Sequence, residues 1–348
     1  MTDRIYIPNL KTSDSELRAL RYLTPAIKNV ILPAFELTRS RVTAKLPEGS
    51  VVRRAEQLIE NYGDSNFIID LTTENDLLNE EMEKFFDERQ GYANWRRFLQ
   101  ASFSGKVIPC LQFVEGGSEL EFKRQVSELM QRYAKVALRT SVSDLEANEL
   151  YRWAVEVAGE KDVTVIGSLY FLDQQSEDVY FDRCRRFLAT VVGNKIPGAI
   201  AFPGSSFPKS VGTGVYGADD GGNFPALELP LFERLRTAFS NMPLVYSDYA
   251  SVHPIRYPTR GGSWVPRIDI VQNGQFTFSR LRSPDGGYAE AARIIFTNYG
   301  RSLPDCWGSD QIKQAATGTV PGKSPSFWIS ARINMWITQR AEELAGTS

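Results

Sequence analysis

Residues 66–72 read NFIIDLT, a short apolar run that ends close to an acidic residue, Asp70. The run is continuous rather than alternating, which is typical of a parallel strand buried on both faces. Similar runs occur at fairly even spacing along the chain, at 4–11, 29–37, 106–113, 135–141, 162–171, 196–208 and 242–254. The sequence therefore predicts eight parallel strands.

Amphipathic helical patterns separate these runs. They cover residues 13–23, 50–63, 77–102, 119–134, 143–159, 177–193 and 229–241, and the longest is predicted to hold two helices. Ser and Asp at the start of the first helix, with Glu16 in its first turn, indicate an N-terminal cap. Alternation of strands and helices over eight strands predicts an α/β fold, a TIM-type (β/α)8 barrel. An open doubly wound sheet is the alternative.

The pattern changes after residue 254. Residues 264–282 form two alternating runs around Asn273-Gly274, a strong signal for a two-residue hairpin turn. Residues 286–300 and 326–346 are helical, and the second helix is a candidate for the eighth helix of the barrel. We expect a single barrel-like domain over residues 1–348, with 255–325 as an inserted hairpin and helical subregion near the last strand.

Composition narrows the possible functions. The 40 Lys and Arg residues nearly balance the 42 Asp and Glu residues, so the net charge of −2 does not support a nucleic-acid partner, which requires clustered cations. The single histidine excludes a histidine-based zinc or iron site. A bound metal would have to be magnesium or manganese, held by oxygen ligands.

Several localisation and cofactor signals are missing from the sequence. The N-terminus lacks the apolar core of a signal peptide, and no apolar run is long enough for a membrane span, so we expect a cytoplasmic protein of a bacterium or bacterial virus without a membrane partner. The three cysteines are scattered, as in a reducing compartment. GTGVYG at 212–217 fits GxGxxG but lacks the strand and helix that the dinucleotide motif requires, so no dinucleotide is expected.

Polar residues recur near the C-terminal ends of the predicted strands, where the loops of a barrel converge on the active site. They are Lys11, Glu36, Asp70, Gln112, Arg139 and Asp248. The carboxylates of Glu36, Asp70 and Asp248 are candidate acid–base groups or magnesium ligands. Lys11 and Arg139 are candidate contacts for an anionic ligand. The alternative is a closed network of ion pairs that binds no ligand.

His253, the only histidine, follows Asp248 by five residues. It is a candidate proton shuttle or ligand contact beside that carboxylate. The alternative is a structural role in a turn, because a residue before proline favours an extended backbone.

Several short motifs occur in an order that resembles a known family. They are YIPNLKTSDSELRAL (6–20), VILPAFEL (30–37), FIIDL (67–71), SDYASVHP (247–254), VPRIDI (265–270), TFSRLR (277–282), WGSDQI (307–312) and FWISARINMW (327–336). The chain resembles the beta protein family of T4-like phages and bacterial genomes, which is distinct from the single-strand annealing Beta of lambda. Ser247 stands where that family often has Gly, and Met335 and Trp336 stand where it often has two histidines.

The resemblance implies a barrel-like fold and a role in phage–host conflict, in defence or counter-defence, but no particular reaction. It adds Arg267 and Arg280, the arginines of the hairpin motifs, to the candidate ligand-binding residues. The first functional hypothesis is a polar rim pocket that binds an anionic or nucleotide-like ligand. If this pocket is catalytic, hydrolysis is the reaction class that we expect.

The second hypothesis is an interaction or scaffold subunit with a protein partner. Four of the six tryptophans lie in the C-terminal part of the chain, and tryptophan is common in interface hot spots. They are Trp264, Trp307, Trp328 and Trp336. The alternative role for these rings is to pack the hairpin region against the barrel.

Overall fold

The computed structural model describes residues 4–173, 177–193, 195–211, 217–218, 220–256 and 264–346. Eight parallel strands form its centre: β1 (Tyr6–Lys11), β2 (Ala34–Leu37), β3 (Ile68–Leu71), β4 (Ile108–Pro109), β5 (Val136–Ser141), β6 (Val163–Ser168), β8 (Ala199–Ala201) and β12 (Leu244–Asp248). Neighbours in space follow the order of the chain, and β12 pairs with β1. A bridge between Cys110 and Ala137 joins β4 to β5. The (β/α)8 barrel is therefore confirmed, and the open sheet is excluded.

Apolar side chains, one from each strand or its immediate end, fill the inside of the barrel. They are Ile7, Ala34, Ile68, Cys110, Ala137, Ile166, Ala201 and Val245. Residues such as Phe35, Ile69 and Leu138 alternate with them and face the surrounding helices. Burial on both faces explains why the strands read as continuous apolar runs.

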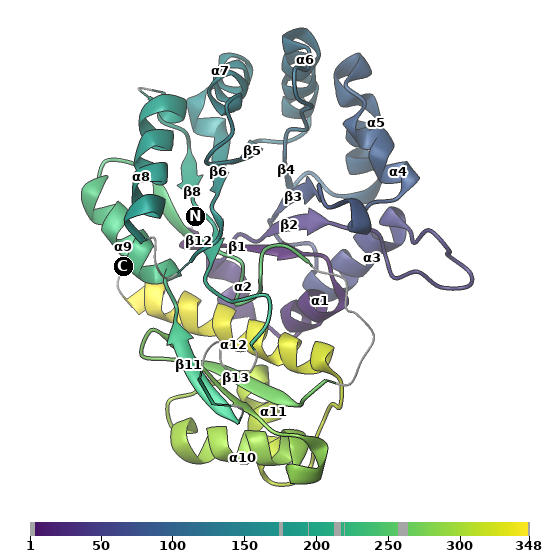
Figure 1. Ribbon diagram of the computed structural model, residues 1–348. Helices are drawn as coiled ribbons and strands as arrows, with labels where there is room; N and C mark the ends of the chain where they lie inside the picture. Colours follow the sequence, from purple (N-terminus) through teal and green to yellow (C-terminus); the bar gives the residue numbers. More distant parts are fainter. Residues whose placement is uncertain are drawn as a thin grey trace.

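Helices cover the outside of the barrel (Figure 1). They are α1 (Asp14–Arg21), α2 (Pro25–Val30), α3 (Val51–Tyr62), α4 (Glu80–Glu83), α5 (Arg89–Ser102), α6 (Glu119–Met130), α7 (Ala147–Ala158), α8 (Glu177–Phe187) and α9 (Glu228–Ala238). The long pattern at 77–102 contains α4 and α5, as predicted. Short 3-10 turns lie at Asn75–Leu77, Lys84–Phe86, Glu160–Asp162 and Ser283–Asp285, and α8 continues into a π-helical turn at Leu188–Val192.

Helix α12 (Pro325–Gly346) packs against α1 and β1 and completes the ring as the eighth barrel helix, as the sequence suggested. The amide of Asn334 joins three helices: its nitrogen donates to the carbonyl of Ala19 in α1, and its oxygen accepts from the N–H of Gly308 in α11 (Trp307–Ala316). The family motif residue Asn334 therefore has a structural role here.

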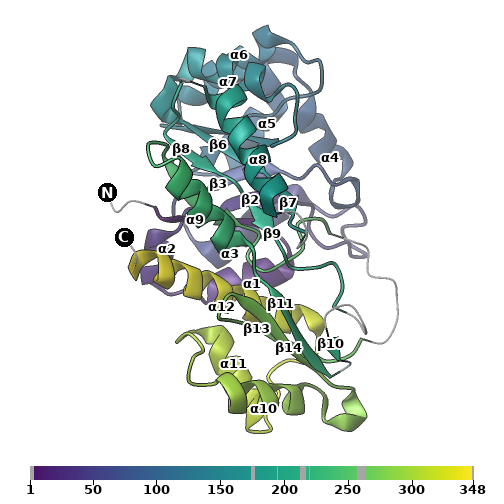
Figure 2. The ribbon, with the colours of Figure 1, turned by 60° about the vertical axis from the view of Figure 1, so that its left-hand side comes forward.

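A second, antiparallel sheet covers the other side of α12, together with α10 (Gly287–Tyr299) and α11 (Figure 2). Its strands are β10 (Gly217–Ala218), β11 (Gly221–Pro225), β14 (Gln275–Arg280) and β13 (Arg267–Gln272), in that order. Asn273 and Gly274, with φ of 51° and 71°, form the predicted hairpin turn. Strands β10 and β11, which precede α9 in the chain, therefore share this sheet with β13 and β14, which follow the last barrel strand.

Two further short strands, β7 (Tyr170–Phe171) and β9 (Gly204–Ser205), extend from β6 and β8 and pair with each other. In the described part of the chain, no helix combines the length and apolar character needed to cross a bilayer. Most of the glycine-rich segment at 212–217 lies outside the described residues.

Candidate functional site

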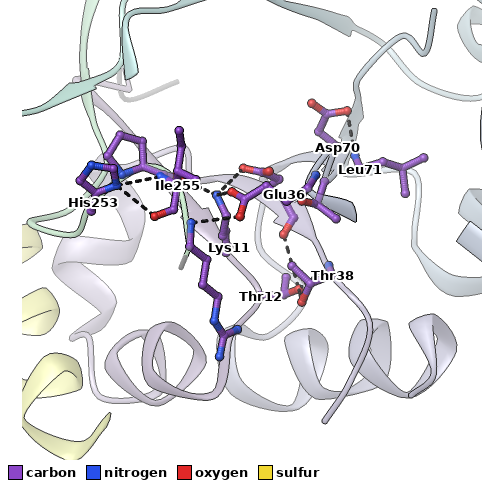
Figure 3. A network of polar contacts seen from close by, with 12 residues as sticks. Lys11, Thr12, Glu36, Thr38, Asp70, Leu71, His253 and Ile255 are labelled. Carbon is purple, nitrogen blue, oxygen red and sulfur yellow. Dashed lines mark hydrogen bonds and ion pairs between the residues drawn. The ribbon is translucent and has the colours of Figure 1, made fainter. Parts of the chain in front are cut away.

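Charged side chains meet inside the barrel at the C-terminal ends of the strands, which we call the mouth. Lys11 Nζ lies 3.2 Å from Glu36 Oε2 and 2.8 Å from Glu74 Oε1. It also donates to the carbonyl oxygen of Pro254 at 2.6 Å (Figure 3). The register of the sheet produces this contact, because Lys11 and Glu36 are direct neighbours across β1 and β2.

Arg139 connects the two carboxylates that end β2 and β3. Its Nε donates to Asp70, its Nη2 donates to the carbonyl of Leu71 at 3.2 Å, and its Nη1 lies 3.6 Å from Glu36 Oε2. Gln112 donates to Asp70 Oδ1 at 2.8 Å. The structure therefore brings together five of the six predicted strand-end residues, namely Lys11, Glu36, Asp70, Gln112 and Arg139.

Mutual attraction keeps Glu36 and Lys11 charged. Burial alone would raise the pKa of Glu36, but Arg139 and Lys11 outweigh it and lower that pKa below its ordinary value. Burial would lower the pKa of Lys11, but Glu36 and Glu74 outweigh it and raise that pKa. The side chains of Lys11, Glu36, Asp70 and Arg139 remain 10–12% exposed, so the network lies just below the surface.

Hydroxyl groups beside this network have no hydrogen-bond partner in the described structure. They belong to Ser168 and Tyr249, both of which are buried. Tyr249 lies within electrostatic range of Arg139 and close to the Ser168 hydroxyl, so a contact between these two hydroxyls is the one polar contact that the described structure offers them. Burial raises the pKa of the Tyr249 phenol far above physiological pH, so it is a neutral hydroxyl. Buried hydroxyls normally have partners, so this group indicates a place for a ligand or water.

The sequence did not identify Ser168, Tyr249 or Glu74 as site residues. Ser168 ends its strand like the predicted residues, so the same rule would have found it had uncharged hydroxyls been included. Tyr249 directly follows Asp248, and the carboxylate of Asp248 had been taken as the site residue of that strand end. Glu74 lies in a loop, where no periodicity places a side chain.

Asp248 lies outside the mouth, on the opposite face of β12. Its neighbour Ser247 faces inward and contacts Asn9, so the alternation of side chains turns Asp248 outward beneath α12. There its carboxylate accepts hydrogen bonds from Tyr6 Oη at 2.6 Å, Trp336 Nε1 at 2.7 Å, Tyr246 Oη at 2.8 Å and the Ala250 N–H at 2.8 Å. Burial raises its pKa, although these donors oppose the shift.

The magnesium or manganese site expected from the sequence combined the carboxylates of Glu36, Asp70 and Asp248, but Asp248 lies apart from the other two. Within the described residues, no three acidic, histidine or cysteine side chains are arranged to hold a metal ion. Glu36 and Asp70 are instead paired with cations.

His253 lies in the loop above the mouth. Its Nδ1 lies 3.0 Å from the carbonyl oxygen of Ile255 (Figure 3). Its ring stacks on Phe171 with centroids 5.2 Å apart. Burial lowers its pKa from the ordinary value. The following residue, Pro254, supplies the carbonyl that binds Lys11, so this turn forms one wall of the mouth.

The hairpin arginines lie in the second sheet, not in the mouth. Arg267 and Arg280 are direct neighbours across β13 and β14. Arg267 Nε lies 2.8 Å from Asp269 Oδ1, and Arg332 of α12 pairs with Asp269 Oδ2 at 2.7 Å. The pair between Arg332 and Asp269 attaches the second sheet to α12.

Three of the four C-terminal tryptophans pack within the structure. Trp328 and Trp336 are buried, and Trp307 stacks on Tyr22 with ring centroids 4.5 Å apart. Trp264 is 56% exposed. Packing of the second sheet onto the barrel therefore accounts for most of this group.

Comparison with known proteins identifies a family and a phage relative. The family model described as Beta protein matches residues 6–342. The chain is 25% identical over 342 residues to Protein beta of Enterobacteria phage P4, covering 97% of this chain and 93% of that relative. This relative comes from phage P4, and not from the T4-like phages with which the motifs associate the family. Among solved structures, the crystal structure of TcOYE with pHBA matches 70% of this chain and 84% of its own, at 10% identity and a TM-score of 0.29.

Proposed function

The chain belongs to the Beta protein family, and from this premise we propose that it acts in phage–host conflict by binding a small anionic, nucleotide-like ligand in the barrel mouth. The similarity to a phage P4 protein over nearly the whole chain supports the connection with phages. The position of the mouth supports ligand binding, because (β/α)8 barrels bind substrates at the C-terminal ends of their strands.

The observation that carries the proposal is the group of unpartnered hydroxyls beside a cation. Ser168 and Tyr249 provide two buried O–H groups near Arg139. Arg139 Nη1 is 3.6 Å from Glu36, beyond hydrogen-bond distance, so it keeps donors for a ligand oxygen. A phosphate or carboxylate oxygen would accept from all three residues.

In this proposal Lys11 supplies a second cation for the ligand once Glu74, the more exposed of its two carboxylate partners, moves away. Glu74 comes from a loop and its side chain is 21% exposed, whereas Glu36 belongs to a strand and is 11% exposed. A bound anion would displace Glu74 from Lys11 and leave the contact with Glu36 intact. Ligand binding and a shift of the loop that carries Glu74 are therefore coupled in this proposal.

Hydrolysis of a bound phosphoester would require a base, and Glu36 is the group suited to that role. Arg139 and Lys11 lower its pKa, so it is ionised at neutral pH. An ionised carboxylate beside a bound phosphoester can accept a proton from an attacking water.

Calorimetric titration with inorganic phosphate and with nucleoside mono-, di- and triphosphates tests the proposal, with product analysis for hydrolysis. We expect one of these anions to bind, and Tyr249→Phe to weaken its binding about tenfold because one hydrogen bond to a charged ligand is lost. Thr140→Val is the matched control, because Thr140 also has a buried, unpartnered hydroxyl but lies on β5 facing away from the mouth. Absence of binding at millimolar anion, or equal affinity in Tyr249→Phe and wild type, would refute the proposal.

The conflict role has its own test. Plating efficiency of a phage panel on host cells with and without the gene should differ for at least one phage, and the Tyr249→Phe variant should reduce that difference. Equal plating of every phage would argue against the conflict role. It would not bear on the ligand site, which the titration tests independently.

The scaffold hypothesis is supported by one exposed ring. Trp264 is the one tryptophan of the C-terminal group that presents more than half of its surface to solvent. A partner captured by wild type and lost in Trp264→Ser, with anion binding unchanged, would favour that function.

A further inference from the structure

A cavity of about 110 Å³ lies outside the barrel, bordered by α5, α6, α7 and the loop that follows β4. These three helices stand side by side in Figure 1. No residue of the mouth network borders the cavity. Four aromatic side chains do, namely Tyr92, Phe113, Phe122 and Trp153. The volume corresponds to roughly three or four water molecules, or one small organic group.

Two carboxylates also line this cavity, and both lack a cation. Within the described residues, neither Glu146 nor Glu149 has an ion-pair partner within 4.0 Å. Glu156 on the same helix differs, because it pairs with Lys123 at 2.6 Å. Glu146 accepts one hydrogen bond, from the Gly116 N–H at 3.0 Å, which leaves its negative charge uncompensated.

The indole of Trp153 adds an unused donor. Its Nε1 is buried and has no hydrogen-bond partner in the described structure, whereas buried indole N–H groups usually have one. Phe122 lies against this ring, with centroids 5.9 Å apart. An oxygen atom of a ligand would satisfy the indole N–H.

The wall that carries Tyr92 is built from a strained backbone. Gln90, Gly91 and Tyr92 have φ of 57°, 65° and 54°, in the left-handed region that glutamine and tyrosine rarely adopt. Gly91 donates its N–H to Glu121 of α6 at 2.5 Å, which holds this turn beside the cavity. Such strain occurs where surrounding structure fixes a position for function.

We propose that this cavity binds a small organic cation that carries a quaternary ammonium and an oxygen. The aromatic rings attract the ammonium through cation–π interactions. Glu146 and Glu149 supply the compensating charge, and the Trp153 N–H donates to the oxygen. This site is separate from the mouth and does not depend on the proposed function.

Choline and its uncharged isostere 3,3-dimethylbutan-1-ol provide the test, because both have the same shape and hydroxyl. Titration of the intact chain by calorimetry and by NMR of the indole N–H signals should show choline binding at least tenfold more tightly. The signal that shifts should be the one missing in Trp153→Phe. Equal affinity for the two compounds, or no binding at millimolar choline, would overturn the proposal.

Variants test separately what the carboxylate charges, the aromatic ring of Trp153 and its indole N–H contribute to binding. The double variant Glu146→Gln/Glu149→Gln should lose about tenfold in choline affinity, since two partly screened attractions are removed. Glu156→Gln, which removes the same charge elsewhere on α7, should bind choline like wild type. Trp153→Phe should lose about threefold and Trp153→Leu about tenfold, because only phenylalanine keeps an aromatic face. Unchanged affinity in the double variant, with the same unfolding midpoint as wild type, would also overturn the proposal.

Discussion

Strands β1 and β12 are neighbours in the barrel, and each ends in a buried charged residue, yet the two residues have different surroundings. Lys11 faces inward and shares the mouth with other charges, some surface exposure and unpartnered hydroxyls nearby. Asp248 faces outward beneath α12, where four neutral donors surround its carboxylate.

The difference shows how to separate a candidate binding group from a structural one. The four donors that contact Asp248 are already used, so a ligand would gain no hydrogen bond from them. In the mouth, Arg139, Ser168 and Tyr249 keep donors for a ligand. Burial and charge are common to both regions, and hydrogen-bonding capacity is what distinguishes them.

Asp248→Ala should have the largest effect on stability. It leaves the buried donors of Tyr6, Tyr246 and Trp336 without an acceptor, so we expect a loss of about 3–5 kcal/mol in the free energy of unfolding. Urea unfolding followed by tryptophan fluorescence measures it, with the exposed Asp305→Ala as control. A loss below about 1 kcal/mol together with weaker anion binding would assign Asp248 to the functional site instead.

Glu228→Gln should stabilise the protein at high pH. Glu228 is buried, its Oε1 accepts from the Ser206 N–H at 2.6 Å, and burial raises its pKa to about 7. The folded state therefore keeps this proton longer than the unfolded state, so wild-type stability falls as pH rises from about 4.5 to 7. The variant should gain about 3 kcal/mol at pH 8 and nothing near pH 4.

Glu233→Gln, on the exposed side of the same helix, is the control for that pH dependence. Unfolding curves from pH 4 to pH 8 should separate the two variants. A difference between Glu228→Gln and wild type that does not change with pH would show that burial does not raise this pKa.

Glu36→Gln tests the mouth and should cost less. Lys11 keeps Glu74 and Arg139 keeps Asp70 in this variant, so we expect a loss of about 1–2 kcal/mol at pH 7. Because the folded-state pKa of Glu36 is lowered, its contribution is present above the unfolded pKa and is lost as pH falls through the folded pKa. Denaturant unfolding should show wild type and variant converging in acid. A cost as large as that of Asp248→Ala would mean that the mouth is mainly structural.

His253→Ala should have the smallest effect, below about 1 kcal/mol, because the residue is only half-buried and its ring stacks on Phe171. Since burial lowers its pKa, the unfolded state binds its proton more readily, and His253 should favour folding less as pH falls below about 6.5. Thermal unfolding at pH 5.5 and pH 8 measures this change. A loss above 2 kcal/mol would place His253 among the residues that hold the barrel together.

Much of the mouth was predictable because strand ends follow a simple rule. Lys11, Glu36, Asp70, Gln112 and Arg139 each lie at or just after the end of an apolar run, and parallel strands bring such positions together. Asp248 also lies at the end of an apolar run, but the rule places it wrongly, because Ser247 is the residue of this strand end that faces the inside of the barrel. A shift of one residue along a strand moves a side chain to the opposite face.

The sequence by itself determined an α/β fold of eight parallel strands and predicted the barrel, because continuous apolar runs separated by amphipathic helices must be buried on both faces. The pairing of β12 with β1 and of β4 with β5, which excludes the open sheet, came from the tertiary structure. The sequence also determined the hairpin at Asn273-Gly274, because that dipeptide adopts the required left-handed turn. Only the tertiary structure decided which face each strand-end residue occupies, that β11 joins the hairpin sheet, and that Ser168 and Tyr249 lie beside Arg139. These features depend on register and on contacts between distant segments, which no local pattern of residues encodes.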